Sequence, residues 1–222
     1  MMWNWSFAWH ILPTILHGMV ITIEATILGM LLALVLGLFW AGLLLLPNRW
    51  IFWSTRGITE FIRDTPLLIQ LFFCYYVLPE IGITIPALLT GITVLGINYS
   101  AYTAEVYRAG LQNIPRGQWD AAKALNFTTW QTFTRIILPQ AIPPIVPAMG
   151  NNLIAMFKDT PLLSTITVME MLDRAMIIGD KTFRYLEPLT MVGILFLIIS
   201  LMASALIGFT QRKILVRRRR PV

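Results

Sequence analysis

Long runs without a charged residue divide the chain into apolar segments. Four of these runs cover residues 25–48, 81–104, 136–157 and 188–211. Each is close to the length of about 20 residues that crosses a bilayer core as a helix. A shorter run, 65–79, reaches that length only together with the more polar residues 57–64. The pattern predicts an all-α integral membrane protein with five transmembrane helices. We expect them at about 18–46, 57–78, 86–108, 135–157 and 187–210.

The composition agrees with a single membrane domain over residues 1–222. Hydrophobic residues make up 57% of the chain and charged residues only 13%, whereas soluble domains carry about a quarter charged residues. Residues 1–17 contain no Lys or Arg, so we expect no cleaved secretory signal, which needs a basic first segment. The lone cysteine, Cys74, excludes a disulfide framework within the chain.

The distribution of Lys and Arg predicts an outer N-terminus and a cytoplasmic C-terminus. In that orientation the cytoplasmic segments carry twelve basic residues and the outer segments four, as the positive-inside rule requires. Trp3, Trp5 and Trp9 would form an aromatic belt at the outer interface. The tail "RKILVRRRR" would anchor the orientation and meet anionic lipid. The net charge of +6 therefore reflects the membrane margins, and we expect no nucleic-acid partner.

A polar stretch at 111–134, between the third and fourth predicted spans, carries signals for a short helix. Pro115 opens a helix of about 116–125, and Asn126 stands where that helix should stop. Thr128 with Gln131 fits a capping box for the next helix. Trp119, Ala122 and Leu125 are spaced to share one face of the short helix. On this pattern alone, a helix that merely joins two spans explains the stretch equally well.

The segment "DAAKALNFTTWQTFTRIILP" resembles the cytoplasmic loop of ABC importer permeases. Their pattern is Glu-Ala-Ala, three residues, Gly, nine residues, and then Ile-x-Leu-Pro. The positions that match are Ala121, Ala122, Ile136, Leu138 and Pro139. Asp120 replaces the Glu and keeps its charge. Asn126 replaces the Gly, and Asn is the next-best residue for the left-handed conformation that ends a helix.

The resemblance extends over most of the chain. "FIRDTPLLIQLFF", "YTAEVYRAGLQNIPRGQ" and "ILPQAIPPIVP" are similar to the polar-amino-acid branch (His/Glu/Gln/Arg/opine) of these permeases, and most of all to ectoine/hydroxyectoine importer permeases. The resemblance implies a permease subunit of an ATP-driven, binding-protein-dependent importer in the bacterial inner membrane. Its substrate would be a polar amino acid or a zwitterionic compatible solute.

The same resemblance implies the partners. The short helix would couple the permease to a separate ABC ATPase dimer, and an external solute-binding protein would deliver the substrate. The second permease subunit would be a homologous paralogue rather than a second copy. The implied ATPase-coupling residues are Gly117, Trp119, Asp120, Ala121, Ala122, Asn126, Ile136, Leu138 and Pro139.

The chain has no GxxxxGK[ST] phosphate loop, so we do not expect it to hydrolyse ATP or to act as an enzyme. ATP and Mg²⁺ would bind to the partner ATPase, and this chain would hold no cofactor. The alternative is a secondary transporter or channel that acts without an ATPase. Intramembrane charges fit that class equally well, but the long cytoplasmic loop does not.

The stretch "RDTPLLIQ" at 63–70 returns as "KDTPLLST" at 158–165. Asp-Thr-Pro is typical of a helix start, because Thr or Asp can accept hydrogen bonds from the first turn and Pro has no N–H to leave unpaired. The repeat therefore predicts helix N-termini at Pro66 and Pro161, capped by these side chains. The second copy opens a run, 160–169, that is too short to cross the membrane and should re-enter or lie at the outer interface.

The repeat also has a functional interpretation. Ionisable residues within a membrane are costly, and broken helices in transporters direct their N-termini at anionic substrates. The translocation-pathway candidates are Arg63, Asp64, Thr65, Glu105, Lys158, Asp159 and Thr160. A pathway lined by both charge signs would suit a zwitterion.

Two of the neighbouring polar features have structural alternatives. Glu105 could simply form an ion pair with Arg108. Asn98, Tyr99, Asn151 and Asn152 could form hydrogen bonds between helices as well as contact substrate.

Pro139, Pro143, Pro144 and Pro147 should bend or break the start of the fourth span.

Overall fold

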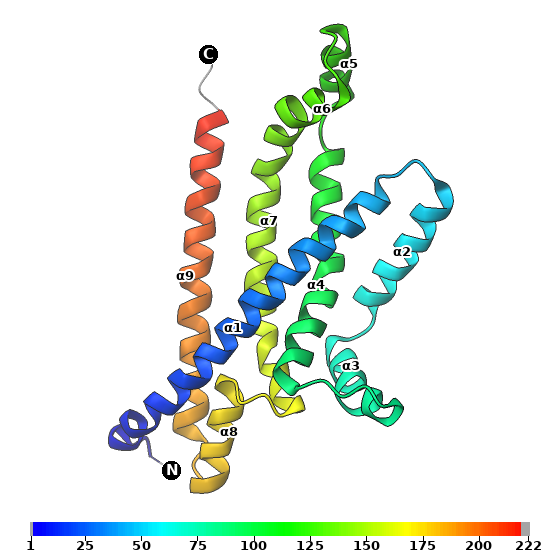
Figure 1. The fold of residues 1–222 in the computed structure, drawn as a ribbon. Coiled ribbons are helices and arrows are strands. Elements are labelled where there is room, and N and C mark those ends of the chain that lie inside the picture. Colours follow the sequence, from blue (N-terminus) through cyan, green and yellow to red (C-terminus); the bar gives the residue numbers. More distant parts are fainter. Residues whose placement is uncertain (1, 219–222) are drawn as a thin grey trace.

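The computed structural model describes the backbone of residues 2–218 and the side chains of residues 2–211, and its regular elements are helical (Figure 1). The α-helices are α1 (Trp5–Leu44), α2 (Arg49–Asp64), α3 (Leu67–Phe72), α4 (Ala87–Gln112), α5 (Arg116–Ala124), α6 (Thr129–Thr132), α7 (Leu138–Asp159), α8 (Met171–Thr182) and α9 (Leu186–Arg218). Two π-turns, η1 (Phe73–Val77) and η3 (Phe133–Ile137), and two 3₁₀ helices, η2 (Leu78–Ile81) and η4 (Thr160–Ile166), connect them. The all-α prediction is confirmed.

Within the described residues, α1 and the portion of α9 up to Gln211 are long and apolar enough to cross a membrane as single helices. The first helix was expected at 18–46 but begins at Trp5. Its 40 residues extend about 60 Å, roughly twice the thickness of the hydrocarbon core. It therefore crosses α4 and α7 obliquely (Figure 1).

The second span, expected to be continuous over 57–78, is broken. Helix α2 and the segment 67–81 pass the span criterion together but meet at an angle of 95°. Pro66 disfavours a helical conformation of the residue before it, and Thr65 is accordingly extended (φ −83°, ψ 124°). We call the junction at Thr65–Pro66 the elbow.

Two other prolines follow π-turns. The turn η1 precedes Pro79, and η3 precedes Pro139. In both, the next backbone N–H bonds a carbonyl five residues earlier, from Leu78 to Phe73 and from Leu138 to Phe133. The wider turn accommodates the missing proline N–H. The expected break at the start of the fourth span is therefore only a local π-turn, and α7 continues through its three internal prolines to Asp159.

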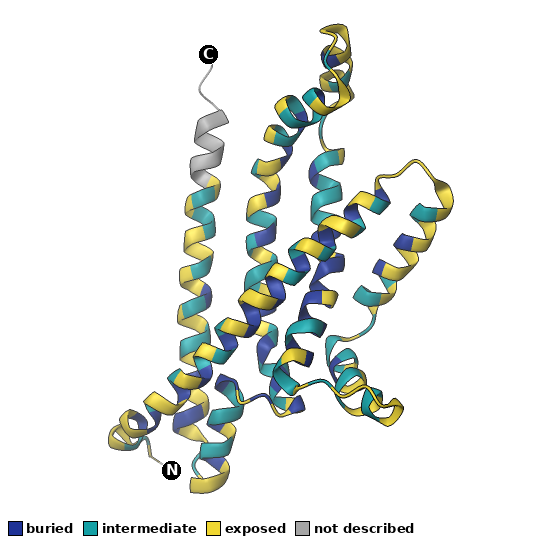
Figure 2. Ribbon diagram, viewed as in Figure 1, coloured by how far each residue is buried: buried dark blue, intermediate teal, exposed yellow. Residues whose placement is uncertain are grey.

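The main core lies where α1 crosses α4 and α7, and buried residues gather there (Figure 2). Small residues on α1 let its backbone approach α4, as is common between membrane helices. The Thr103 hydroxyl donates to the carbonyl of Ala33 (2.8 Å), and a methyl group on Gly37 would overlap that hydroxyl. The contact between α1 and α4 therefore depends on Gly37.

Helix α8 docks against α1 through a buried carboxyl outside the spanning helices. The Glu170 side chain is fully buried and accepts hydrogen bonds from the backbone N–H of Asp173 (2.8 Å) and the hydroxyl of Thr22 (3.4 Å). The backbone N–H of Met171 donates to Thr22 Oγ1 (3.3 Å). Burial raises the pKa of Glu170 to about 6, although the hydrogen bonds that it accepts oppose this shift.

The substitution Gly37→Ala should destabilise the protein by about 1–3 kcal/mol, because the new methyl group must displace Thr103. The matched control is Gly42→Ala on the same helix, where a methyl group would meet no atom within 4 Å. Thermal unfolding of the detergent-purified protein, followed by tryptophan fluorescence, measures the difference. Equal unfolding temperatures for the two variants would show that α1 and α4 are not packed this closely.

The raised pKa of Glu170 predicts a pH dependence of stability. The folded state binds this proton more tightly than the unfolded state, so stability should fall by about 2 kcal/mol as the pH rises from 4.5 to about 6. Glu170→Gln keeps a capping oxygen but does not titrate. It should lack this decrease and unfold at a higher temperature than the wild type at pH 7.5. Glu80→Gln removes an exposed carboxyl and is the control. A decrease that persists in Glu170→Gln contradicts the assignment.

Candidate functional site

The elbow places Arg63 and Thr65 beside a cavity. Helix α2 ends at Asp64, and α3 begins at Leu67 with no side-chain cap. The Thr65 hydroxyl donates backward to the carbonyl of Phe61 (2.7 Å), which also accepts the Thr65 N–H (3.1 Å). The expected capping by Thr65 or Asp64 is wrong, because the hydroxyl serves the helix that ends here and not the one that begins.

The second copy of the repeat behaves in the same way. Asp159 is the last residue of α7, and the hydroxyl of Thr160 donates backward to the carbonyl of Phe157 (2.7 Å). The helix η4 that follows has no side-chain cap. Its residues Leu163 and Ile166 are fully buried. The run that was too short to cross is thus a 3₁₀ helix packed into the protein.

A pocket of about 450 Å³ lies between the elbow, α4 and the end of α7. It brings together three of the pathway candidates, Arg63, Thr65 and Asp159. Its lining is Arg63, Thr65, Pro66, Leu67, Asn98, Tyr99, Tyr102, Asn152, Ala155 and Asp159. The Tyr99 hydroxyl donates to Asp159 Oδ2 (2.7 Å), which fixes the only carboxylate in this lining. We call this cavity the central pocket.

Two residues that line the central pocket each carry a buried hydrogen-bond donor without a partner among the described residues. The donors are Nε of Arg63 and Nδ2 of Asn152. Buried polar groups are normally paired, so such donors call for an explanation. With Asp159 in the same lining, the pocket offers donors, including a cation, together with a carboxylate. That set can bind a molecule that carries both charge signs.

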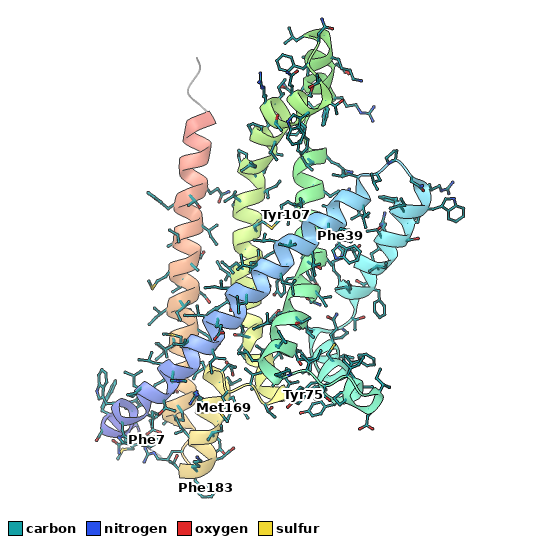
Figure 3. All side chains as sticks on the ribbon, viewed as in Figure 1. Phe7, Phe39, Tyr75, Tyr107, Met169 and Phe183 are labelled. Carbon is teal, nitrogen blue, oxygen red and sulfur yellow. The ribbon has the colours of Figure 1, made fainter. Side chains whose placement is uncertain are left out.

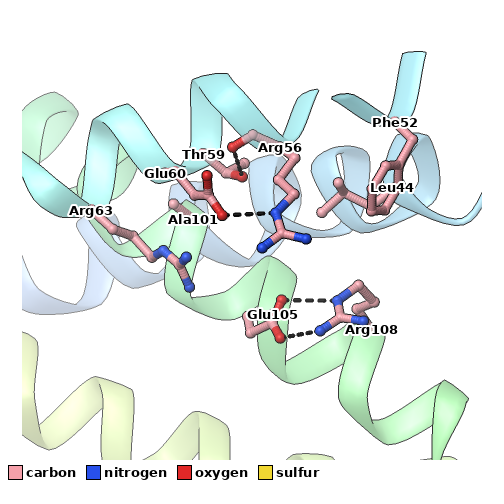
Figure 4. Close-up of a pocket in the computed structure, with 9 residues that line it drawn as sticks. All are labelled: Leu44, Phe52, Arg56, Thr59, Glu60, Arg63, Ala101, Glu105 and Arg108. Carbon is pink, nitrogen blue, oxygen red and sulfur yellow. Dashed lines mark hydrogen bonds and ion pairs between the residues drawn. The ribbon is translucent and has the colours of Figure 1, made fainter. Parts of the chain in front are cut away.

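A smaller pocket of about 130 Å³ shares Arg63 with the central pocket. Figure 4 shows the residues that line this smaller pocket. It holds two ion pairs, Arg56 with Glu60 (2.7 Å) and Arg108 with Glu105, each within a single helix. The structural alternative for Glu105, an ion pair with Arg108, is therefore confirmed. Glu105 lines this smaller pocket and not the central one.

Three other pathway candidates lie elsewhere. Asp64 is exposed and lines neither pocket. Lys158 lines a neighbouring groove of about 630 Å³ along α7 and α9, which shares Ala155 but not Lys158 with the central pocket. Thr160 is fully buried in its own backbone contact. The structure thus separates Lys158 from Asp159, although they are adjacent in the chain.

The interpretation of the residues from the sequence missed Gln70, whose side chain bridges the elbow and α4. The only signal was a difference in the repeat, where the second copy has Thr165 at the matching position. The structural alternative for Asn98 is confirmed, and its contact with substrate stays a prediction. It is hydrogen bonded between helices and it lines the central pocket.

Helix α5 matches the short helix expected at 116–125. Asn126 takes the left-handed conformation (φ 55°), and the N–H of Phe127 bonds the carbonyl of Ala122 (3.0 Å), which is a Schellman helix end. The capping box of Thr128 and Gln131 is present. Helix α5 lies at the same end of the molecule as the C-terminal end of α9, and the N-terminus lies at the other end (Figure 1).

The faces of α5 differ from the expectation. Ala122 is fully buried, on the side where α5 meets α6 and η3, whereas Leu125 is 68% exposed. The two therefore do not share an outward face. Gly117, Asp120 and Ala121 are exposed. Of the other coupling residues, Trp119, Ile136 and Leu138 are partly buried and Pro139 is exposed.

The family model for binding-protein-dependent transport system inner membrane components matches residues 33–221. This match covers most of the chain, and the protein belongs to that family. It is a multi-pass inner-membrane protein with an ABC permease fold.

Curated relatives narrow the class of transporter within this family. A probable amino-acid ABC transporter permease protein, y4tG of Sinorhizobium fredii, is 54% identical over 91% of this chain and 87% of its own. The arginine transport system permease protein ArtQ of Bacillus subtilis is 31% identical over 91% and 93%.

Solved structures agree. One titled "Crystal structure of an amino acid ABC transporter with histidines" has a TM-score of 0.91 at 34% identity and covers 96% of this chain and 100% of its own. A chain of the MetNI methionine transporter in an inward-facing conformation has a TM-score of 0.78 at 20% identity over 92% and 97%, which shows the fold alone.

The protein is accordingly a permease subunit of an amino-acid ABC importer. Permease subunits of this family are generally non-catalytic, and the ATPase is a separate chain. Membership implies an ATPase and a solute-binding protein as partners.

The exposure of α5 predicts which residues reach the ATPase. In a Cys74→Ser background, Ala121→Cys should crosslink to the co-expressed ATPase through a thiol–amine reagent, with a yield that changes on ATP binding. Ala122→Cys, one position along, should not crosslink, because that side chain faces its own chain. Crosslinking is measured on gels of the purified transporter. Equal yields at the two positions, or no crosslink at Ala121, would place the ATPase contact elsewhere.

Proposed function

We propose that the central pocket carries the substrate, and that this substrate is a zwitterionic polar amino acid. The observation that carries the proposal is that residues with unpartnered donors and a fixed carboxylate line the same pocket. Arg63 Nε and Asn152 Nδ2 suit the substrate carboxylate, and Asp159 suits its ammonium group. Charge-assisted hydrogen bonds of this kind are stronger than hydrogen bonds between neutral groups. Ionisable groups at membrane depth typically mark such a pathway.

Similar proteins support an amino acid as the substrate. The structure with a TM-score of 0.91 is of an amino acid transporter with histidines, and ArtQ is part of an arginine system. The resemblance to ectoine/hydroxyectoine permeases makes a zwitterionic compatible solute the second candidate. Ectoine also carries a carboxylate and a delocalised cation, so the same donors and carboxylate would serve it.

The smaller pocket would continue the route towards the cytoplasm, since Arg63 lines both cavities. Its two intrahelical ion pairs would keep the wall polar. Glu105 would then line the exit rather than the central pocket. Asp64, Lys158 and Thr160 would have no direct contact with the substrate.

We further propose five spans in one transmembrane domain of residues 1–222, with the N-terminus outside and the C-terminus in the cytoplasm. The spans would be α1, the broken α2–η2, α4, α6–α7 and α9. Helix α5 lies at one end of the molecule, and Phe7 and Phe183 lie at the other (Figure 3). This arrangement supports the orientation that the basic residues predict. The basic tail itself lies outside the described side chains.

Coupling would run from α5 into α7. The exposed residues Gly117, Asp120 and Ala121 would enter a groove of the ATPase dimer, which binds ATP and Mg²⁺. Trp119, Ala122 and Asn126 would shape α5 from within the loop. Ile136, Leu138 and Pro139, at the π-turn and the start of α7, would transmit the motion to the spans. The second permease subunit would be a paralogue rather than a second copy.

Uptake by the reconstituted transporter tests the proposal. Proteoliposomes that contain the permeases, the ATPase and the binding protein are supplied with labelled histidine, arginine, glutamine or ectoine. We expect ATP-dependent uptake that falls by about tenfold or more in Arg63→Gln and in Asp159→Asn, because each loses a charge-assisted contact. Glu24→Gln removes an exposed carboxyl from α1, away from both pockets, and is the control.

Two results would overturn the proposal. Normal uptake by both Arg63→Gln and Asp159→Asn would remove the central pocket from the pathway. Uptake by this chain without the ATPase would instead support the secondary-transporter alternative, which the comparisons do not favour.

A further inference from the structure

The elbow creates an unpaired backbone acceptor in an apolar span. The carbonyl of Ile62 would ordinarily accept a hydrogen bond from the N–H four residues later. That residue is Pro66, which has no N–H. The carbonyl of Thr65 lies in the break itself. Where no water is at hand, each unsatisfied group of this kind is costly, so broken membrane helices need another donor.

The Gln70 side chain supplies that donor. Its Nε2 donates to the carbonyls of Ile62 (2.7 Å) and Thr65 (3.0 Å), which uses both of its N–H groups. Its Oε1 accepts from Nδ2 of Asn98 on α4 (3.3 Å). Nδ2 of Asn98 also donates to the carbonyl of Ile62 (3.3 Å), so this carbonyl accepts from both amides, more closely from Gln70. One amide thus joins the end of α2, the break, α3 and α4.

This amide bridge ends at the wall of the central pocket. Ile62, whose carbonyl it holds, directly precedes Arg63. Asn98 directly precedes Tyr99, whose hydroxyl holds Asp159. Arg63, Asn98, Tyr99 and Asp159 all line the pocket. The bridge therefore connects the backbone that carries the cation to the helix that fixes the carboxylate.

We propose that Gln70 is a positioning residue that fixes the angle of the elbow, and with it the direction in which Arg63 enters the central pocket. Its importance for transport rests on the proposed function of that pocket. Its effect on the geometry of the elbow does not.

The second copy of the repeat shows that the sequence context alone does not create such a bridge. Thr165 stands at the position that matches Gln70, and its hydroxyl donates only to the nearby carbonyl of Leu162 (2.7 Å). The short helix there is held by the burial of Leu163 and Ile166 instead. The amide bridge is part-buried against α4, where Asn98 is only 5% exposed.

The first experiment measures the elbow directly in the assembled transporter in lipid nanodiscs. In a Cys74→Ser background, spin labels are placed at Ile58→Cys on α2 and Ile81→Cys at the end of η2, both exposed positions. Pulsed electron paramagnetic resonance should give one narrow distance with Gln70. Gln70→Leu, which is similar in size but has no donor, should broaden it or add a second distance.

The second experiment measures the direction of residue 63. The variant Arg63→Cys is made in the Cys74→Ser background, without the spin-label sites. It is treated with a charged, water-soluble methanethiosulfonate reagent. We expect the modification rate to change by about tenfold when Gln70→Leu is added, the size of effect that one lost hydrogen bond to a buried group produces. This readout needs neither a substrate nor active transport.

A matched control and a second variant separate positioning from general stability. Thr210→Val removes a side-chain hydrogen bond on α9, where the hydroxyl only shares carbonyls of its own helix. Should Gln70→Leu fail to assemble, Gln70→Met replaces it, because Met has a similar length and flexibility and has no N–H or O–H donor.

The outcomes are distinct. Altered distances and labelling, at an unfolding temperature equal to that of Thr210→Val, support the positioning role. Unchanged distances and labelling overturn it, and so does a variant that is merely less stable with both readouts unchanged. Normal uptake by Arg63→Gln would remove the proposed function of the pocket and leave the result at the elbow standing.

Discussion

The architecture depends on one constraint, that the backbone polar groups of an apolar span must find partners inside the protein. Prolines within the helices break this rule locally, and at three of them, Pro66, Pro79 and Pro139, the chain answers in one of two ways. Before Pro79 and Pro139 the helix widens into a π-turn. It then continues as α7 after Pro139, but it ends in the short 3₁₀ helix η2 after Pro79. At Pro66 it breaks by 95°, and a side-chain amide from the next helix replaces the missing N–H. A cavity forms at the second kind of site, because a bent span cannot fill the space beside α4.

The cost of charge in the membrane explains which groups are paired. Arg56 with Glu60 and Arg108 with Glu105 are neutralised within their own helices, so each pair can move with its helix as a unit. Outside the spanning helices, Glu170 is buried and forms no ion pair with any side chain that the structure describes, and burial raises its pKa. Arg63 forms no ion pair within the described part of the chain. Its charge faces Glu60 and Glu105 in the smaller pocket and Asp159 in the central pocket.

The sequence predicted the features that depend on local chemistry. Charge-free runs located the apolar helices, and cap residues located α5 to within one residue, including the left-handed Asn126. Prediction from the sequence failed where one local pattern is compatible with two structures. Asp-Thr-Pro fits a capped helix start, but the same hydroxyl can bond backward, as Thr65 and Thr160 do. It also misplaced the start of α1, because the first 17 residues lack charges yet mix polar with apolar positions, so their helix shows only through its packing against α8 and α9.

The site itself could be predicted only in part, because its members meet through tertiary contacts. Arg63 and Asp159 stood out because ionisable residues are costly in a membrane, and Thr65 because it belongs to a helix-start pattern. The three do share a pocket. Lys158 looked equivalent to Arg63 in the repeat, but the helical rotation between residues 158 and 159 turns it into the groove along α7 and α9. Gln70 reaches back eight residues, twice the span of a helical contact, so no periodicity marks it. The break between α2 and α3 explains why the Gln70 side chain can reach Ile62. A half-helix that turns by 95° brings its first turn beside the carbonyls that the proline left open, and a long amide at that turn is the side chain that can both close them and bond α4.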